Sequence, residues 1–94
     1  MILFLLGCIE YEEGMAEQGA LHCKLLDVCG ELAAVGYENV DDCISDAESQ
    51  SWIACERSAY DAEDMQACVD GWEAAVESKT CDANPAECAS VCDR

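Results

Sequence analysis

Basic side chains are scarce in this sequence. Its 94 residues include 4 Lys and Arg against 21 Asp and Glu, so the formal net charge is -17. Proteins that bind nucleic acids neutralise phosphates with Lys and Arg, and the same residues bind anionic lipid headgroups. The sequence therefore predicts no nucleic-acid partner and no electrostatic binding to anionic lipid. The acidity fits a soluble, self-repelling surface, a basic partner, or weak binding of a divalent cation.

Proline and aromatic residues are also few. The chain has one proline and 6% aromatic residues, yet 52% of its residues are hydrophobic and many of these are alanine. Alanine is the best helix former, whereas strands favour β-branched and aromatic residues. A chain of this length forms a single domain with a thin core. We therefore predict one all-α domain, a small disulfide-stapled bundle of three to four helices.

Long apolar runs are missing, and the strongest one, residues 1–6, is too short to span a bilayer. It ends at the box Leu5-Leu6-Gly7-Cys8, and polar residues follow at once. This boundary resembles a bacterial lipoprotein signal, in which the cysteine of a Leu-x-Gly-Cys box becomes the lipidated N-terminus. No Lys or Arg precedes the run, and the run is shorter than the roughly 7–15 residues usual for the apolar segment of a signal peptide. We therefore expect translation to start upstream of residue 1.

The cysteines give an independent reason to separate Cys8 from the others. Nine cysteines in a short chain indicate a disulfide scaffold in an oxidising compartment. An odd number cannot all pair within one monomer. If Cys8 carries lipid, eight remain for four bridges; otherwise residues 1–7 are an ordinary apolar tail and Cys8 is a stray thiol. The eight are Cys23, Cys29, Cys43, Cys55, Cys68, Cys81, Cys88 and Cys92.

The predicted organisation has three parts. Residues 1–7 are the remnant of a signal peptide, residues 8–14 form an acidic tether, and residues 15–94 form the disulfide-rich helical domain.

Apolar spacing predicts the first helix over residues 15–29. Leu21, Leu25 and Val28 recur at the helical period, and Gly30 is a natural left-handed stop.

A loop with a ragged turn, ending at Gly36, then leads to the second predicted helix. Asn39 is its expected N-cap, with Asp42 three positions later in a capping-box-like arrangement. We expect this helix to end near Ser58.

The third predicted helix has Asp61 as its N-cap. Its apolar stripe contains Met65, Cys68, Val69, Trp72, Val76 and Lys79. A turn follows, and Asn84-Pro85-Ala86-Glu87 predicts a last short helix with Asn84 as cap and Pro85 in the first helical position.

Disulfide geometry suggests one bridge near each turn, because bridged Cα atoms lie about 4.4–6.8 Å apart. A nested pairing of Cys23 with Cys55 and Cys29 with Cys43 fails, since the spacings along the two helices would be about 9 Å and about 18 Å. The predicted pairs are Cys29 with Cys43, Cys55 with Cys68, Cys81 with Cys88, and Cys23 with Cys92. The last pair would join the first and last helices of an up-down-up-down bundle.

Cysteine chemistry of other kinds has weak support. The sequence contains no Cys-x-x-Cys, the usual spacing of thioredoxin-like redox pairs and zinc ribbons. The nearest zinc arrangement would use Cys88 and Cys92 with Cys81 nearby. His22 could be a ligand, but a lone histidine of this kind is more often simply half-exposed on a helix.

Catalytic and cofactor motifs are absent from the sequence. It contains no recognisable nucleophile motif and no glycine-rich phosphate loop, so we expect neither an enzyme nor a cofactor. The acidic clusters do not fit the spacing of a calcium loop. Four aromatic residues are expected in core and rim packing rather than in a ligand platform: Tyr37, Trp52, Tyr60 and Trp72.

The lipoprotein-like box, the acidity and the eight-cysteine helical body together resemble the small cysteine-rich lipoproteins of myxobacteria and their relatives. That resemblance implies an outer-membrane or periplasmic envelope protein, anchored through lipid on Cys8, with a structural or protein-interaction role. The protein partner is not specified. A second resemblance, to the small acidic disulfide-rich helical pheromones of ciliates, implies instead a secreted extracellular signalling ligand.

Overall fold

The computed structural model describes residues 9–50 and 55–93, and these residues form an all-α fold stapled by disulfides. No strand occurs in these two stretches. The α-helices are α1 (Tyr11–Val28), α2 (Val40–Gln50) and α3 (Ala62–Ser78). Short 3-10 turns lie between and after them: η2 (Ala33–Val35), η3 (Arg57–Ala59) and η4 (Ala86–Ser90). The predicted fold class is confirmed.

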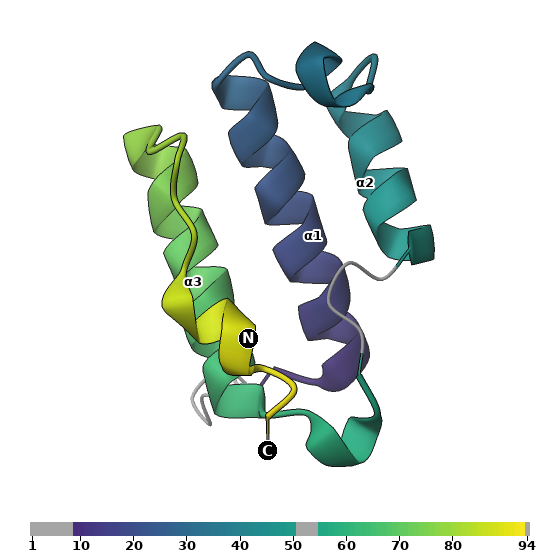
Figure 1. Ribbon diagram of the computed structural model, residues 1–94, viewed down its shortest axis with the longest axis vertical. Helices are drawn as coiled ribbons and strands as arrows, with labels where there is room; N and C mark the ends of the chain where they lie inside the picture. Colours follow the sequence, from purple (N-terminus) through teal and green to yellow (C-terminus); the bar gives the residue numbers. More distant parts are fainter. Residues whose placement is uncertain (1–8, 51–54, 94) are drawn as a thin grey trace.

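Helix α1 lies in the middle of the molecule, with α3 on one side and α2 on the other (Figure 1). Helices α1 and α3 run in the same direction, and α2 runs in the opposite one. After α3 the chain turns back and η4 packs along that helix (Figure 1). The up-down-up-down order is as predicted, but the fourth element is a 3-10 turn and not an α-helix.

The start of α1 corrects the predicted acidic tether, or spacer, of residues 8–14 from residue 9 onward. The helix begins at Tyr11, and Ile9 is buried in the core at 6% exposure. The hydroxyl of Tyr60 donates a hydrogen bond to the carbonyl oxygen of Ile9 at 2.6 Å. The acidic residues that suggested a spacer, Glu12 and Glu13, lie in the first helical turn, where the helix dipole favours carboxylates.

The end of α1 follows the sequence in part. Leu21 and Leu25 are buried as predicted, whereas Val28 is 40% exposed and does not belong to the core. Gly30 follows the helix with a φ of 69°, and Gly36 ends η2 with a φ of 99°. Both glycines therefore supply the left-handed backbone that the predicted stops require.

Helix α2 begins as predicted but ends earlier. The backbone N–H of Asp42 donates to the Asn39 side-chain oxygen at 2.9 Å, which confirms the cap. The helix ends at Gln50, and η3 is a separate turn, so the predicted continuation to Ser58 is wrong. Just before η3, the carbonyl oxygen of Cys55 accepts a 2.6 Å hydrogen bond from the Tyr11 hydroxyl of α1.

Helix α3 matches its predicted start. The N–H of Asp64 donates to the Asp61 carboxylate at 3.0 Å, which confirms that cap. The buried residues of α3 are Met65, Cys68, Val69, Trp72 and Ala75. Lys79 does not extend the stripe; it is exposed, and its left-handed φ of 54° ends the helix.

The last short element also differs from its prediction. No side chain caps η4, and Pro85 stands at the N-cap position instead of Asn84. The N–H of Cys88 bonds to the Pro85 carbonyl at 3.1 Å, which is the i to i+3 pattern of a 3-10 turn.

Two separate cores lie on the two sides of α1. The larger core, on the α3 side, consists of Ile9, Leu21, Leu25, Tyr60, Met65, Cys68, Val69, Trp72, Ala75 and Val91. The smaller core, on the α2 side, consists of Cys23, Leu32, Cys43 and Ala47. Half of the smaller core is thus a single cystine.

Candidate functional site

The eight cysteines predicted to form bridges make four disulfides with one another. Their Cα separations are 4.8–5.9 Å, within the usual range for disulfides. The pairs are Cys23 with Cys43, Cys29 with Cys81, Cys55 with Cys92, and Cys68 with Cys88.

All four predicted pairs are wrong: Cys29 with Cys43, Cys55 with Cys68, Cys81 with Cys88, and Cys23 with Cys92. The prediction placed three bridges at turns between consecutive helices and used the fourth to join the first helix to the last. Because α1 and α3 run in parallel side by side, their C-terminal ends meet, and Cys29 bonds to Cys81 there. The loop between α1 and α2 extends beyond the end of α1, which places the first turn of α2 opposite Cys23.

The remaining two bridges fix the C-terminal segment. Cys68 on α3 bonds to Cys88 in η4, and Cys55 bonds to Cys92. Both follow from the return of the chain along α3. No sequence signal distinguished this return from a fourth helix packed against α1.

The bridges also change what the cysteines can do chemically. Cys81, Cys88 and Cys92 belong to three different disulfides, so they do not form the zinc arrangement considered above. Within residues 9–50 and 55–93, no group of three or more His, Cys, Asp or Glu side chains is placed to hold a metal ion. Cys8, the predicted lipid site, and Trp52 lie outside the described residues.

His22 stacks on the core. Its ring lies 4.6 Å from the ring of Trp72, centroid to centroid, with 15° between the planes. His22 is half-buried, and burial lowers its pKa below the ordinary value. Trp72 is 6% exposed, as expected for a core residue, and its indole N–H has no hydrogen-bond partner in the described part of the chain.

An apolar hollow lies beside His22, between α1 and the loop that follows it. It has a volume of about 210 Å³ and is lined by His22, Leu26, Val35 and Tyr37. The Tyr37 hydroxyl donates a 2.6 Å hydrogen bond to the Asp46 carboxylate on α2, and this bond is the main cause of a raised Tyr37 pKa. Sequence reasoning missed this hollow, although an apolar Val35 in a predicted loop was an available signal.

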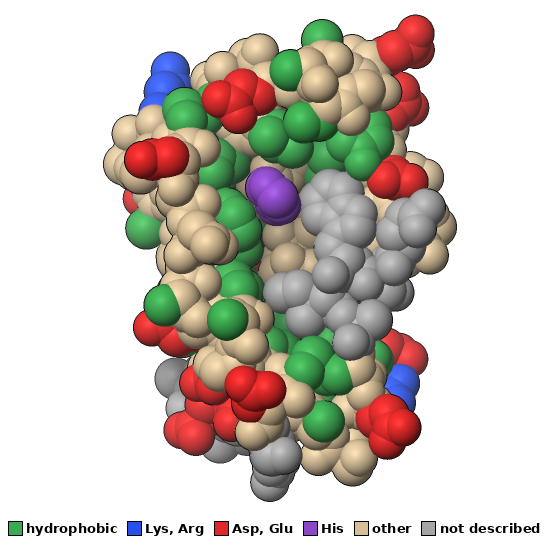
Figure 2. Space-filling view, viewed as in Figure 1, with side chains coloured by type: hydrophobic (Ala, Val, Ile, Leu, Met, Phe, Trp, Pro, Cys, Tyr) green, Lys and Arg blue, Asp and Glu red, His purple; other side chains and the backbone are tan. Residues whose placement is uncertain are grey.

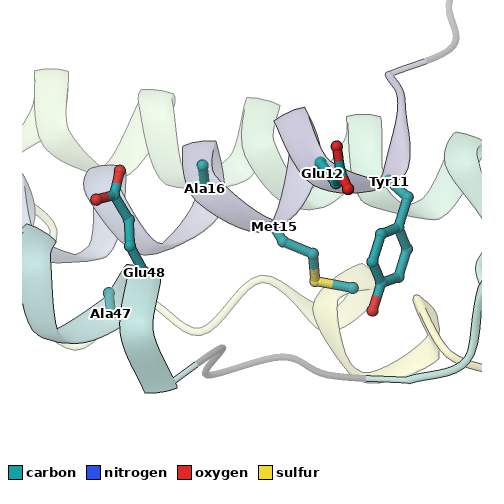
Figure 3. A pocket seen from close by; sticks show the side chains of 6 residues that line it. All are labelled: Tyr11, Glu12, Met15, Ala16, Ala47 and Glu48. Atoms are coloured by element: carbon teal, nitrogen blue, oxygen red, sulfur yellow. The ribbon is translucent and has the colours of Figure 1, made fainter.

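Two further hollows lie along α1. One of about 190 Å³ separates Tyr11 and Met15 of α1 from Ala47 and Glu48 of α2 (Figure 3). The other, of about 420 Å³, lies between α1 and α3. Its lining combines apolar and acidic or amide side chains: Ile9, Glu13, Glu17, Gln66, Val69 and Glu73.

Among the described residues, the cysteines and His22 near these hollows already have structural contacts. The cysteines of the two cores are bonded, and His22 packs against an indole ring rather than against a hydroxyl or thiol nucleophile.

The four disulfides place the domain in an oxidising extracytoplasmic or secreted location. No helix in the described stretches is long and apolar enough to cross a membrane. Among protein families, curated proteins and solved structures, no significant match to this chain was found.

Proposed function

We propose that this protein is a non-enzymatic domain of the bacterial envelope, anchored by lipid on Cys8 and acting through protein contacts or as a structural component. The observation that supports it most is the closed set of four disulfides. Since Cys23 through Cys92 pair with one another, none of these eight is left to bond Cys8 within the chain. A cysteine directly after Leu-Leu-Gly is the residue that lipoprotein processing modifies.

The contacts of Ile9 indicate how close to the membrane such an anchor would hold the domain, and in which orientation. Ile9 is buried, and its carbonyl oxygen accepts the hydrogen bond from Tyr60. Acyl chains on Cys8 would thus leave almost no free backbone between lipid and fold. The N-terminal end of α1 would face the membrane, and the loop from Gly30 to Gly36 would face away from it (Figure 1).

The proposal includes no catalytic role for the eight cysteines of the domain, because all of them are bonded in disulfides. Cys23, Cys43 and Cys68 have 0% exposure and are bonded. Thiolate, not disulfide sulfur, is the nucleophile in cysteine enzymes.

Intact-mass measurement tests the anchor. The protein is expressed with its upstream reading frame in a bacterium that processes lipoproteins, beside the Cys8→Ser variant as control. We expect a wild-type chain that begins at Cys8, carries diacylglyceryl and acyl groups, and sediments with membranes. The Cys8→Ser chain should carry no lipid.

The alternative is the secreted signalling ligand, which a small disulfide-dense helical domain also fits. In that case the mature wild-type protein would appear in the medium without lipid. An unmodified Cys8, or a Cys8 bridge joining two copies, would contradict the anchor.

A further inference from the structure

The apolar hollow beside His22 has the size of a site for one side chain. Its volume of about 210 Å³ is below the roughly 300–1,000 Å³ of pockets that hold drug-sized ligands. Protein interfaces, in contrast, often depend on a single large apolar residue that fills a small pocket. The hollow therefore fits an anchor side chain of a protein partner better than a small-molecule ligand.

The side chains that line this hollow are held in place by contacts with neighbouring elements. The His22 ring stacks on Trp72 of the larger core, and Tyr37 is bonded to Asp46 of α2. On the loop side, the N–H of Glu31 bonds to the Leu26 carbonyl at 2.8 Å. A preformed site loses less side-chain freedom when a partner binds.

Val35 makes this surface more apolar than a solvated loop needs to be. It is 53% exposed, and with Val28 it is one of two large hydrophobic residues exposed in the described stretches. Figure 2 shows apolar side chains above and to the left of His22, with acidic side chains toward the upper edges of that region. An apolar surface with a charged rim is typical of an interaction site.

Charge selects the kind of partner. The Asp46 carboxylate stands at the rim through its bond to Tyr37, and the exposed Glu31 and Glu38 lie in the same loop region. A second copy of the chain would bring another net charge of -17 against this surface. Nucleic acid and anionic lipid would be repelled in the same way, whereas Lys and Arg would be attracted.

We propose that the hollow lined by His22, Leu26, Val35 and Tyr37 binds one large apolar side chain of a protein partner whose neighbouring residues are Lys or Arg. This inference rests on the proposed protein-interaction role but not on the lipid anchor. In the anchored orientation the hollow would lie toward the end of the domain that faces away from the membrane.

Peptide titration followed by NMR tests the proposal, using the full chain with Cys8→Ser so that lipidation cannot affect the result. The probe is a helical 14-residue peptide of Leu and Lys. Two control peptides replace every Lys by Glu or every Leu by Ala. We expect the Leu/Lys peptide alone to shift the amide signals of residues 22–37, with binding that weakens as salt rises.

Two exposed valines supply matched variants. Val35→Ser should weaken binding about three- to tenfold, because it removes apolar lining. Val28→Ser, at a similar exposed position outside the hollow, should leave it unchanged. The proposal is overturned if the Leu/Lys peptide does not bind, if the Ala peptide binds as well, or if both variants weaken binding equally. Peptide-independent dimerisation through the same residues would also overturn it.

Discussion

The two sides of α1 are stabilised in different ways. Toward α3, the helix buries a continuous set of apolar side chains that includes Met65 at 0% exposure and Trp72. Toward α2, the buried set is small and centres on the Cys23–Cys43 bridge. The α3 side is thus held by packing with bridges added, and the α2 side depends mainly on one bridge.

The largest expected effect on stability comes from removing a disulfide. Removing one bridge from each side of α1, with loops of equal size, should show how differently the two sides depend on their bridges. Cys23–Cys43 and Cys68–Cys88 both join residues 20 apart, so the chain-entropy contribution of each is similar, about 3 kcal/mol. The Cys23→Ala/Cys43→Ala variant should lose protection from amide hydrogen exchange throughout α2 while α3 stays protected.

The matched Cys68→Ala/Cys88→Ala variant should keep α2 protected. Its C-terminal segment retains the bridge from Cys55 to Cys92, the buried Val91, and a 2.7 Å bond from the Asp61 N–H to the Val91 carbonyl. Intact α2 protection after loss of Cys23–Cys43 would show that packing alone holds α2.

Gly14 and Gly19 of α1 show how closely this helix is packed on each of its two sides. A Cβ at Gly14 would lie 2.5 Å from the Met65 side chain and 2.8 Å from the Tyr60 hydroxyl, whereas one at Gly19 would lie 2.9 Å from the Ala47 Cβ. Overpacking costs about 1–3 kcal/mol, and replacing a helical glycine by alanine returns up to about 1 kcal/mol.

We therefore expect Gly14→Ala to lower the free energy of unfolding by about 1–2 kcal/mol. Gly19→Ala should cost less, because its Cβ would meet a single atom, the Ala47 Cβ, although that atom can yield only if α2 shifts slightly against α1. Urea unfolding with unchanged m-values provides the measurement. An equal or larger loss for Gly19→Ala would indicate that the α2 side is the more tightly packed one.

The smallest expected effects concern the two confirmed N-caps. Asn39→Ala and Asp61→Ala each remove one bond to a first-turn N–H and should cost about 1 kcal/mol. Loss of the Asn39 cap should appear mainly as local opening of α2, and loss of the Asp61 cap as a lower global stability. Hydrogen exchange reports local opening and denaturant unfolding reports global stability, so the two measurements together distinguish these outcomes. Ser45 is exposed, and the control variant Ser45→Ala should change the free energy of unfolding by no more than about 0.5 kcal/mol. If both cap variants lowered the local stability of their helix and the global stability of the domain by the same amounts, the proposed difference between the α2 side and the α3 side would be contradicted.

Local signals in the sequence predicted the starts of α2 and α3 and the glycine stops, although the cap signal at Asn84 failed. Asn39 and Asp61 cap helices, and Gly30 and Gly36 end segments, because these roles depend on a residue and its immediate neighbours. The disulfide pairs could not be predicted, since they depend on which helices lie side by side.

The first residues of the domain show a second limit of sequence reasoning. Ile9 precedes a stretch that looks solvated, but its burial depends on Tyr60, which lies 51 residues further along the chain. The hollow beside His22 likewise combines a helix, a loop and the distant Trp72, none of which signals the others in the sequence.

The central claim is that the eight cysteines of the domain form a closed set and leave Cys8 for another role. Non-reducing peptide mapping of protein made with its upstream reading frame tests this most directly. The structure predicts four linked peptide pairs, Cys23 with Cys43, Cys29 with Cys81, Cys55 with Cys92 and Cys68 with Cys88, which leave none of these eight cysteines to pair with Cys8. Recovery of Cys8 linked to any of the eight would contradict it.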